Sequence, residues 1–320
     1  MVRNQFTESI KRQAINWFWG NYTAVPMEHQ SIFDMGSSVD AYEQSVSGIG
    51  MGELAEVAEG EEFEVDNAAE GFTVYAKMRK FGKRTEVTQE LVEDNRQVKS
   101  FLKSIVSGWG SATNMTMERF FAKFFVYGGL TAGHDVFNNT ITGILTDSTG
   151  NLCYDSKPLF NLSGNERTSK GGGTYYNGIA SDLDADNFET LWNLITVTNA
   201  KNERDEEVVI MPNMLIVPPQ LRFTAQRLLE SEKKPGEFVN DINTLQDIVT
   251  LKVWRYLAGD SNAWFLGTAG KGLKGYRRRP PKVDFYYDED REVYKAKTST
   301  RFGGTVDDFR PWGGSNFATT

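Results

Sequence analysis

The sequence has little of the chemistry on which most enzymes and secreted proteins depend. Its 320 residues include two histidines, His29 and His134, and a single cysteine, Cys153. One cysteine excludes an internal disulfide framework, and neither histidine has the spacing of a metal-binding or catalytic motif. No Gly-X-Ser-X-Gly segment is present to expose a nucleophilic serine. The sequence therefore predicts a protein that is not an enzyme and has no cofactor or metal.

Long apolar runs are also missing. Residues 1–26 lack the apolar core of a signal peptide, and no segment approaches the ~18 consecutive apolar residues of a membrane helix. We expect a soluble protein, made in a reducing cytosol and without membrane contact. The net charge of −8 and the pI near 5.1 argue against tight general binding to nucleic acid. With 39% hydrophobic residues, the chain can still bury the core of one large or two ordinary domains.

Two motifs resemble ligand sites but depart from them. Three glycines within 270–275 have the spacing of a dinucleotide-binding loop, but the basic, proline-containing stretch 276–281 follows where a helix must begin. We expect a flexible loop there. Three aspartates within 182–186 imitate a calcium loop, yet Asn187 replaces the required glycine. An N-cap at Asp184 explains them better.

The N-terminal region predicts a helix followed by an arm. Apolar residues recur on one helical face at Phe6, Ile10, Ala14, Ile15 and Phe18, and the pattern ends at Gly20. The stretch up to residue 52 is polar and irregular. Because long structureless stretches are unusual inside a compact domain, we expect an arm that lies against another surface, for which a neighbouring subunit is a natural candidate.

Residues 53–84 have opposite charges in their two halves. The acidic half contains Glu53, Glu56, Glu59, Glu61, Glu62, Glu64, Asp66 and Glu70, and the basic half contains Lys77, Arg79, Lys80, Lys83 and Arg84. Alternating residues at 63–65 and 72–74, with turn residues at 67–71, predict a β-hairpin. It is either a solvated hairpin with weak cross-strand ion pairs, or a hairpin too polar to stand alone that lies on a partner. Both readings stay open on the residues alone.

A helical pattern follows from Thr88, the expected N-cap, to about residue 133. Gly108 and Gly110 are the expected place for a kink or break, because glycine disfavours the interior of a helix. Four phenylalanines within 120–125 are expected in the core.

Residues 134–260 read as a separate α/β unit. Helices are predicted at 184–195 and 218–232, and strands at 214–217 and 249–253. A paired-strand pattern follows at 283–287 and 292–298. Between the α/β unit and these two strands lies a basic cluster, for which a solvated loop or contact with an acidic hairpin is favoured over contact with DNA phosphates. The cluster consists of Lys271, Lys274, Arg277, Arg278 and Arg279.

Short motifs in a fixed order carry a resemblance to a known family. They include Glu59-Gly60, Gly71-Phe72-Thr73, the helix entry 87–94, Lys157-Pro158-Leu159-Phe160, the segment 215–221, Asn240-Asp241-Ile242-Asn243, Tyr256-Leu257, Ala263-Trp264-Phe265-Leu266, Arg301-Phe302-Gly303-Gly304 and the ending 309–315. The chain resembles the major capsid proteins of tailed bacteriophages, and within them the branch of the phage Mu-type major head protein. Relatives often carry a histidine after Leu-Phe, where this chain has Asn161, so no role of that histidine is carried over.

The resemblance implies an α+β protein with the Hong Kong 97-like phage capsid fold. It implies an N-terminal arm (1–52), an extended hairpin loop over the adjacent subunit (53–84), and a peripheral domain with a long spine helix (85–133 and 261–320). An axial domain (134–260) would be rejoined by the last residues. Expected inter-subunit contacts lie at Glu59, Glu61, Glu62, Glu64, Lys77, Arg79, Lys80, Arg277, Arg278 and Arg279.

The implied function is self-assembly into hexamers and pentamers of an icosahedral shell that encloses double-stranded DNA, with at most weak non-specific contact. The implied partners are further copies of the chain, a separate scaffolding protein, a portal and decoration proteins. The implied location is the virion, with assembly in the host cell cytoplasm. Covalent cross-linking stays open. An encapsulin-type bacterial compartment is the alternative with the same architecture, and a soluble α/β enzyme is the alternative from another class.

Overall fold

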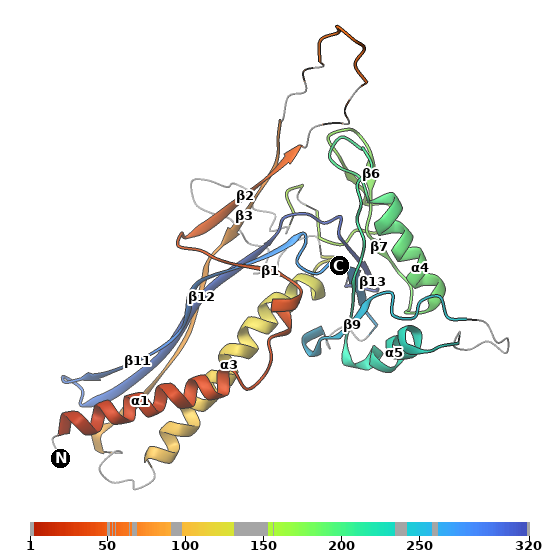
Figure 1. Ribbon diagram of the computed structural model, residues 1–320. Coiled ribbons are helices and arrows are strands. Elements are labelled where there is room, and N and C mark those ends of the chain that lie inside the picture. Colours follow the sequence, from red (N-terminus) through yellow and green to blue (C-terminus); the bar gives the residue numbers. More distant parts are fainter. Residues whose placement is uncertain are drawn as a thin grey trace.

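The computed structural model describes residues 3–49, 52, 54, 56–63, 65, 69–90, 98–130, 153–155, 157–233, 242–257 and 262–318. These residues form two bodies that lie side by side (Figure 1). The elongated body holds the longest helix and the longest strands, and the second body holds two short helices beside a small sheet. The N-terminus lies at the far end of the elongated body, and the C-terminus lies near the junction. Within the described ranges, no helix is long and apolar enough to span a membrane.

A four-stranded sheet and two helices make the elongated body. Its elements are α1 (Arg3–Tyr22), η1 (Glu28–Ser31), β1 (Asp34–Ser37), β4 (Arg79–Thr88), α3 (Val98–Val126), β11 (Leu273–Asp288) and β12 (Val293–Val306). The strand order is β1-β11-β12-β4, with β1 parallel to β11 and the other pairs antiparallel. Helix α3 runs beside the sheet and α1 packs along α3 (Figure 1).

The predicted strand pair at 283–298 is confirmed and is longer than expected. Strand β11 begins at Leu273, so Arg277, Arg278 and Arg279 lie in a strand and the expected flexible loop there is wrong. The register of β11 against β12 shifts between Arg277 and Lys282. This segment includes Pro280 and Pro281, which have no N–H to donate to the ladder, so the strand bulges there and continues.

Helix α3 differs from its prediction at its C-terminal end and in the middle. Thr88 ends β4 and pairs with Val293, and residues 89–90 directly after it are helical, so its role as an N-cap stays a prediction. Helix α3 itself is described from Val98, and residues 91–97 lie outside the described residues. The helix ends at Val126 and runs through Gly108 and Gly110 without a break. A Cβ on Gly110 would lie 2.9 Å from the Tyr22 backbone nitrogen and would also meet the Phe18 carbonyl oxygen. The glycine is therefore where α1 and α3 approach each other closely, and it has no role as a helix breaker.

We expect Gly110→Ala to destabilise the protein by about 1–3 kcal/mol, because the added methyl group pushes α1 away from α3. Gly108→Ala is the matched control: a Cβ at Gly108 meets nothing within 4 Å. It should stabilise the helix by about 0.5–1 kcal/mol through the better propensity of alanine. Chemical denaturation of both variants measures the difference, and stabilisation by both would refute the close-contact explanation.

The core of the elongated body is rich in aromatic rings, and the prediction for the phenylalanines is confirmed. Phe121, Phe124 and Phe125 are completely buried. Their rings pack against Phe33 from the segment before β1 and against Phe302 from β12. The core therefore joins the N-terminal region, the long helix and the C-terminal hairpin of strands.

A five-stranded sheet with helices α4 (Ala185–Asn193) and α5 (Arg222–Glu230) makes the second body. The sheet order is β7 (Gly178–Ile179), β13 (Trp312–Ser315), β10 (Trp264–Gly267), β8 (Met214–Val217) and β9 (Thr250–Val253). The short elements β5 (Arg167–Thr168), β6 (Thr174–Tyr175), η2 (Leu194–Thr198), η3 (Pro219–Leu221) and η4 (Arg255–Leu257) complete it. Strand β10 was expected in the other domain, but it pairs with β8 and β13 here.

The predicted helices and strands of this second body are confirmed. The side chain of Asp184 accepts a hydrogen bond from the backbone N–H of Asn187 at 2.7 Å, as an N-cap does. Ala225, Leu228 and Leu229 form the buried stripe of α5. These signals were readable because each depends only on residues within one turn or on one face of a helix.

The predicted hairpin is displaced along the chain. Strand β2 (Tyr42–Ile49) pairs with β3 (Ala69–Lys77), so residues 63–65 do not pair with 72–74 as expected. The basic half is also elsewhere, because β4 (Arg79–Thr88) pairs with β12 of the same molecule. The hairpin is displaced because β3 and β4 form longer hydrogen-bonded ladders with β2 and β12 than a short hairpin around residues 67–71 could supply.

The expected N-terminal arm is largely part of the molecule itself. Helix α1 packs along α3, and its Ala14 and Phe18 are buried there, although Ile15 is exposed. Strand β1 joins the main sheet and β2 forms the hairpin. The helix ends at Tyr22 and so extends slightly past the predicted Gly20. The described residues of this region therefore make many contacts within the chain, and the contact of residues 1–52 with a neighbouring subunit stays a prediction.

Candidate assembly surfaces

The loop between β2 and β3 projects from the top of the molecule and ends far from both bodies (Figure 1). Its described apolar side chains are almost fully exposed: Leu54 by 99%, Phe63 by 83% and Val65 by 81%. Burying such a side chain contributes roughly 1.5–3 kcal/mol. Three of them together on one protruding segment indicate a surface that is covered by another molecule.

The acidic residues predicted as contacts lie on this projecting loop. Glu59, Glu61 and Glu62 are exposed, and Glu56 lies beside them. Among the described residues, none of these four carboxylates has a cationic partner within ion-pair distance. Glu64 lies outside the described residues. The loop thus presents negative charge together with apolar side chains.

Aromatic and charged contacts at the base fix the direction of the hairpin. The ring of Phe72 on β3 stacks on the ring of Tyr154, with 3.6 Å between the ring centres and 9° between the ring planes, and Lys170 Nζ lies 5.1 Å from the centre of the Phe72 ring. Burial raises the pKa of Tyr154. On β2, Ser45 accepts a hydrogen bond from Lys274 Nζ at 3.0 Å and also contacts Asp307. These contacts hold the base of the hairpin.

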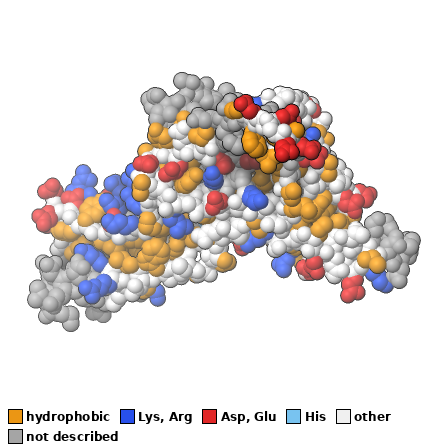
Figure 2. All heavy atoms as spheres, turned by 45° about the horizontal axis from the view of Figure 1, so that its top comes forward, with side chains coloured by type: hydrophobic (Ala, Val, Ile, Leu, Met, Phe, Trp, Pro, Cys, Tyr) orange, Lys and Arg blue, Asp and Glu red, His pale blue; other side chains and the backbone are white. Residues whose placement is uncertain are grey.

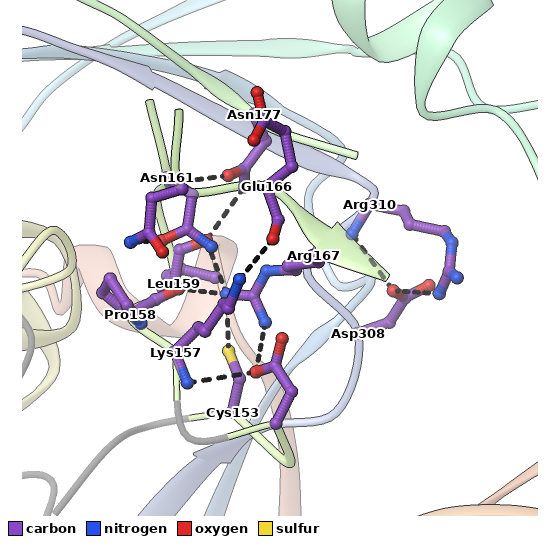
Figure 3. Close-up of polar contacts among 12 residues, drawn as sticks. Cys153, Lys157, Pro158, Leu159, Asn161, Glu166, Arg167, Asn177, Asp308 and Arg310 are labelled. Carbon is purple, nitrogen blue, oxygen red and sulfur yellow. Dashed lines mark hydrogen bonds and ion pairs between the residues drawn. The ribbon is translucent and has the colours of Figure 1, made fainter. Parts of the chain in front are cut away.

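Two buried arginines, Arg167 and Arg310, lie against one phenylalanine of the C-terminal motif; Figure 3 shows polar contacts of both arginines. Arg167 lies 4.3 Å and Arg310 lies 5.0 Å from the Phe309 ring. Arg167 pairs with Asp155 at 2.7 Å, and its other terminal nitrogen donates to the carbonyl oxygen of Pro158. Arg167 is 1% exposed, so the pair needs all of these partners to offset the desolvation of the charge.

Arg310 makes the second half of this network. It pairs with Glu203 at 2.9 Å and with Asp308 at 3.3 Å. Cys153 is buried beside Arg167, 3.4 Å from a guanidinium nitrogen, and burial raises the pKa of its thiol to about 11. The thiol is therefore almost entirely protonated at neutral pH and is a weak nucleophile. The network of ion pairs therefore has a structural role: it fixes the C-terminal segment to the rest of the subunit.

The sequence of this chain matches a known family. The family described as phage capsid protein covers residues 70–313 of the chain, which include the hairpin base, the long helix and the C-terminal motif. The chain belongs to the phage capsid protein family. It is therefore a structural protein of the virion, the major capsid protein that forms the shell. No protein with a curated function matches the chain.

Solved phage capsids share the fold of this capsid protein. The capsid of a native GTA particle has a TM-score of 0.52 and 12% identity over 93% of this chain and 97% of its own. Mycobacterium phage Cain has a TM-score of 0.52 and 12% identity over 94% of both chains. Mycobacterium phage Adephagia has a TM-score of 0.52 and 12% identity over 90% and 88%. The predicted α+β capsid fold is confirmed.

The capsid protein does not bring its predicted acidic and basic contacts together. Lys77 ends β3 and Arg79 and Lys80 begin β4, in the elongated body and apart from the tip that carries the glutamates. Figure 2 shows a cluster of Lys and Arg side chains on this body, at the left. Contact between the two charged halves within one molecule, the first of the two open readings, is therefore not observed for the described residues.

The three consecutive arginines of the capsid protein face different ways. Arg277 is opposite Phe302, on the face that packs against the helices, and Arg279 is opposite Arg301, on the other face. Arg278 is the extra residue of the bulge. Sequence reasoning missed Arg301. The alternation of side chains along β12 could have identified Arg301, because even-numbered residues from 296 to 302 are buried and odd-numbered ones are more exposed.

The rejected ligand motifs have structural explanations in the capsid protein. Gly270 and Gly272 have φ values of 70° and 75°, and they form the turn that leads into β11. Asp184 caps α4, as predicted. Over the part of the chain that the structure describes, no group of three or more His, Cys, Asp or Glu residues is arranged to hold a metal ion.

Proposed function

We propose that this major capsid protein assembles head to tail into hexamers and pentamers, which tile an icosahedral shell around double-stranded DNA. The observation that supports this is the projecting loop with Leu54, Phe63 and Val65 in solvent, far from any surface of its own molecule. A protrusion that fits a different surface of the next copy makes a heterologous contact, and such contacts close into rings.

The parts of the elongated and second bodies would then have the roles of the Hong Kong 97-like architecture. The β2–β3 loop extends over the adjacent subunit, α3 is the spine of a peripheral domain, and the second body is the axial domain near the centre of the ring. A separate scaffolding protein guides assembly in the host cytoplasm, a portal occupies one vertex, and decoration proteins bind outside. The family match supports a phage shell over an encapsulin-type compartment.

Truncating the loop tests this proposal. Replacing residues 52–67 by a short Gly-Ser turn keeps both strands of the hairpin and removes the acidic and apolar tip. The variant should be as helical as the parent by circular dichroism, but it should form no rings or shells in negative-stain microscopy, alone or with the scaffolding protein. The parent chain is the control. Monomers from the parent under both conditions, or normal shells from the truncated variant, would refute the proposal.

A further inference from the structure

Three cations stand side by side on the outer face of the four-stranded sheet. Lys80 on β4 is directly opposite Arg301 on β12, and Arg301 is directly opposite Arg279 on β11. Residues directly opposite each other on neighbouring strands share a face, so all three point away from the helices. We call Lys80, Arg279 and Arg301 the cationic row.

The cationic row lacks the counter-charges that other cations of the same sheet have. Lys282 pairs with Asp284 at 2.7 Å, and Lys295 pairs with Asp288 at 2.5 Å. Within the described part of the chain, no carboxylate pairs with any member of the row. Among the described residues, the Arg279 guanidinium donates to a single acceptor, the Ser299 hydroxyl, at 2.9 Å.

The guanidinium groups of the row are also short of hydrogen-bond acceptors. The buried Nε atoms of Arg279 and Arg301 have no acceptor among the described residues. Like charges directly opposite each other destabilise a sheet, so a folded subunit has no stability reason of its own to keep them adjacent. An anion from outside the molecule would turn this repulsion into a favourable contact.

The anion with the matching chemistry is in the chain itself. Residues 53–70 contain eight carboxylates and no lysine or arginine. Glu56, Glu59, Glu61 and Glu62 are exposed and have no ion-pair partner among the described residues, and the loop points away from its own sheet (Figure 1). Because the loop does not reach the row of its own molecule in this fold, a second copy is the source that fits.

The spacing of the two partners also agrees. Neighbouring strands are ~4.8 Å apart, so the row spans roughly 10 Å. Residues 58–61 form a turn in the loop, in which the Glu61 N–H donates to the Ala58 carbonyl oxygen at 3.1 Å and Gly60 has a φ of 88°. The two ends of such a turn are less than ~7 Å apart, so Glu59, Glu61 and Glu62 lie close enough together to meet members of the row. Arginine is suited to this contact because its planar fork pairs with a carboxylate in two places.

We infer that the cationic row is the docking site for the acidic loop of a second copy, with carboxylates of residues 59–62 paired to Lys80, Arg279 and Arg301. This inference rests on the proposed assembly through the loop and names the surface that receives it. It also separates the predicted basic residues: Lys80 and Arg279 belong to the site with Arg301, and Arg277 does not.

Charge reversal on each side, followed by the combination of both, tests the docking site. Arg279→Glu with Arg301→Glu, and separately Glu59→Arg with Glu61→Arg, should each lower the fraction of chain in shells at least tenfold in sedimentation. The combined four-fold variant should regain shells because opposite charges meet again. Lys80→Glu alone, at an exposed position, should weaken assembly in a salt-dependent way without a change in melting temperature.

Arg222→Glu with Arg227→Glu on α5 is the matched control, with the same change of net charge on exposed helix positions. It should assemble normally; an equal loss of shells there would attribute the effect to net charge and overturn the inference. Normal shells from every row variant would also overturn it and leave the proposed function standing, whereas parent chains that never form shells would refute that function. Normal empty shells that retain less DNA would assign the row to phosphate binding instead.

Discussion

Replacing Trp312 by alanine should destabilise the folded subunit by about 3–5 kcal/mol, in the range for a large buried aromatic side chain. Trp312 is completely buried on β13, and its ring packs edge-on against Phe125 of α3 at 5.3 Å. Its Nε1–H donates to the Lys271 carbonyl oxygen at 2.7 Å. The side chain thus connects the second body to the core of the elongated body, and its loss leaves both a cavity and an unpaired carbonyl group.

Denaturant unfolding of the subunit, followed by circular dichroism, measures this effect. Trp312→Phe is the informative companion, because it keeps most of the apolar volume and removes the hydrogen bond. It should lose only about 1–3 kcal/mol, from the unpaired carbonyl and the smaller ring. Equal losses for both variants would mean that the hydrogen bond alone matters, and a loss below ~1 kcal/mol for the alanine variant would contradict the predicted role.

Glu118→Ala should have the second largest effect, a loss of about 3 kcal/mol from two buried polar groups that lose their partner. Glu118 is 1% exposed on α3. One carboxyl oxygen pairs with His29 Nδ1 at 2.7 Å, and the other accepts the indole N–H of Trp254 at 2.7 Å. These partners come from η1 and from the segment after β9, so one side chain joins three regions that are distant in sequence.

The variants Glu118→Gln and Glu189→Ala calibrate this prediction. Glutamine has the same shape but one acceptor oxygen, so it should satisfy one of the two partners and lose about half as much stability. Glu189 is exposed on α4, and its replacement should change stability by less than ~0.5 kcal/mol. Unfolding curves for the three variants give the order directly. A Glu118→Ala variant as stable as the Glu189→Ala variant would show that the buried network contributes nothing.

Both stability predictions concern residues that connect the two bodies, whereas the assembly predictions concern residues that the folded subunit does not need. This difference allows the experiments to be separated. Variants of the projecting loop and of Lys80 should melt like the parent and fail to assemble. Variants of Trp312 and Glu118 should melt early, whatever their effect on assembly.

Several parts of the fold were readable from the sequence because their signals are local. The N-cap at Asp184 depends on a residue three positions away, and the buried stripe of α5 repeats with the period of a helix. The strand pair β11–β12 was visible from alternating residues next to a short turn. The family itself was visible from the order of many short motifs, which the match over residues 70–313 confirms.

Other parts depended on which segments meet in space. Gly110 was interpreted as a helix breaker, because propensity describes a helix in isolation and does not include α1 packed against it. Residues 42–49 were assigned to an arm, since nothing local identifies β3 as their partner. The cationic row also needed the register, because Lys80 and Arg301 are 221 positions apart and become neighbours only when β4 pairs with β12.

The sequence by itself determined the absence of catalytic motifs, the short helices and strands of the second body, the aromatic core and membership of the capsid family. Only the tertiary structure decided where the hairpin lies, which face each arginine occupies and which cations have no counter-charge among the described residues. The physical reason is that hydrogen bonds within a helix turn and apolar periodicity act over a few residues. Strand pairing and charge neighbourhoods depend on long-range contacts, and many registers satisfy the same local pattern.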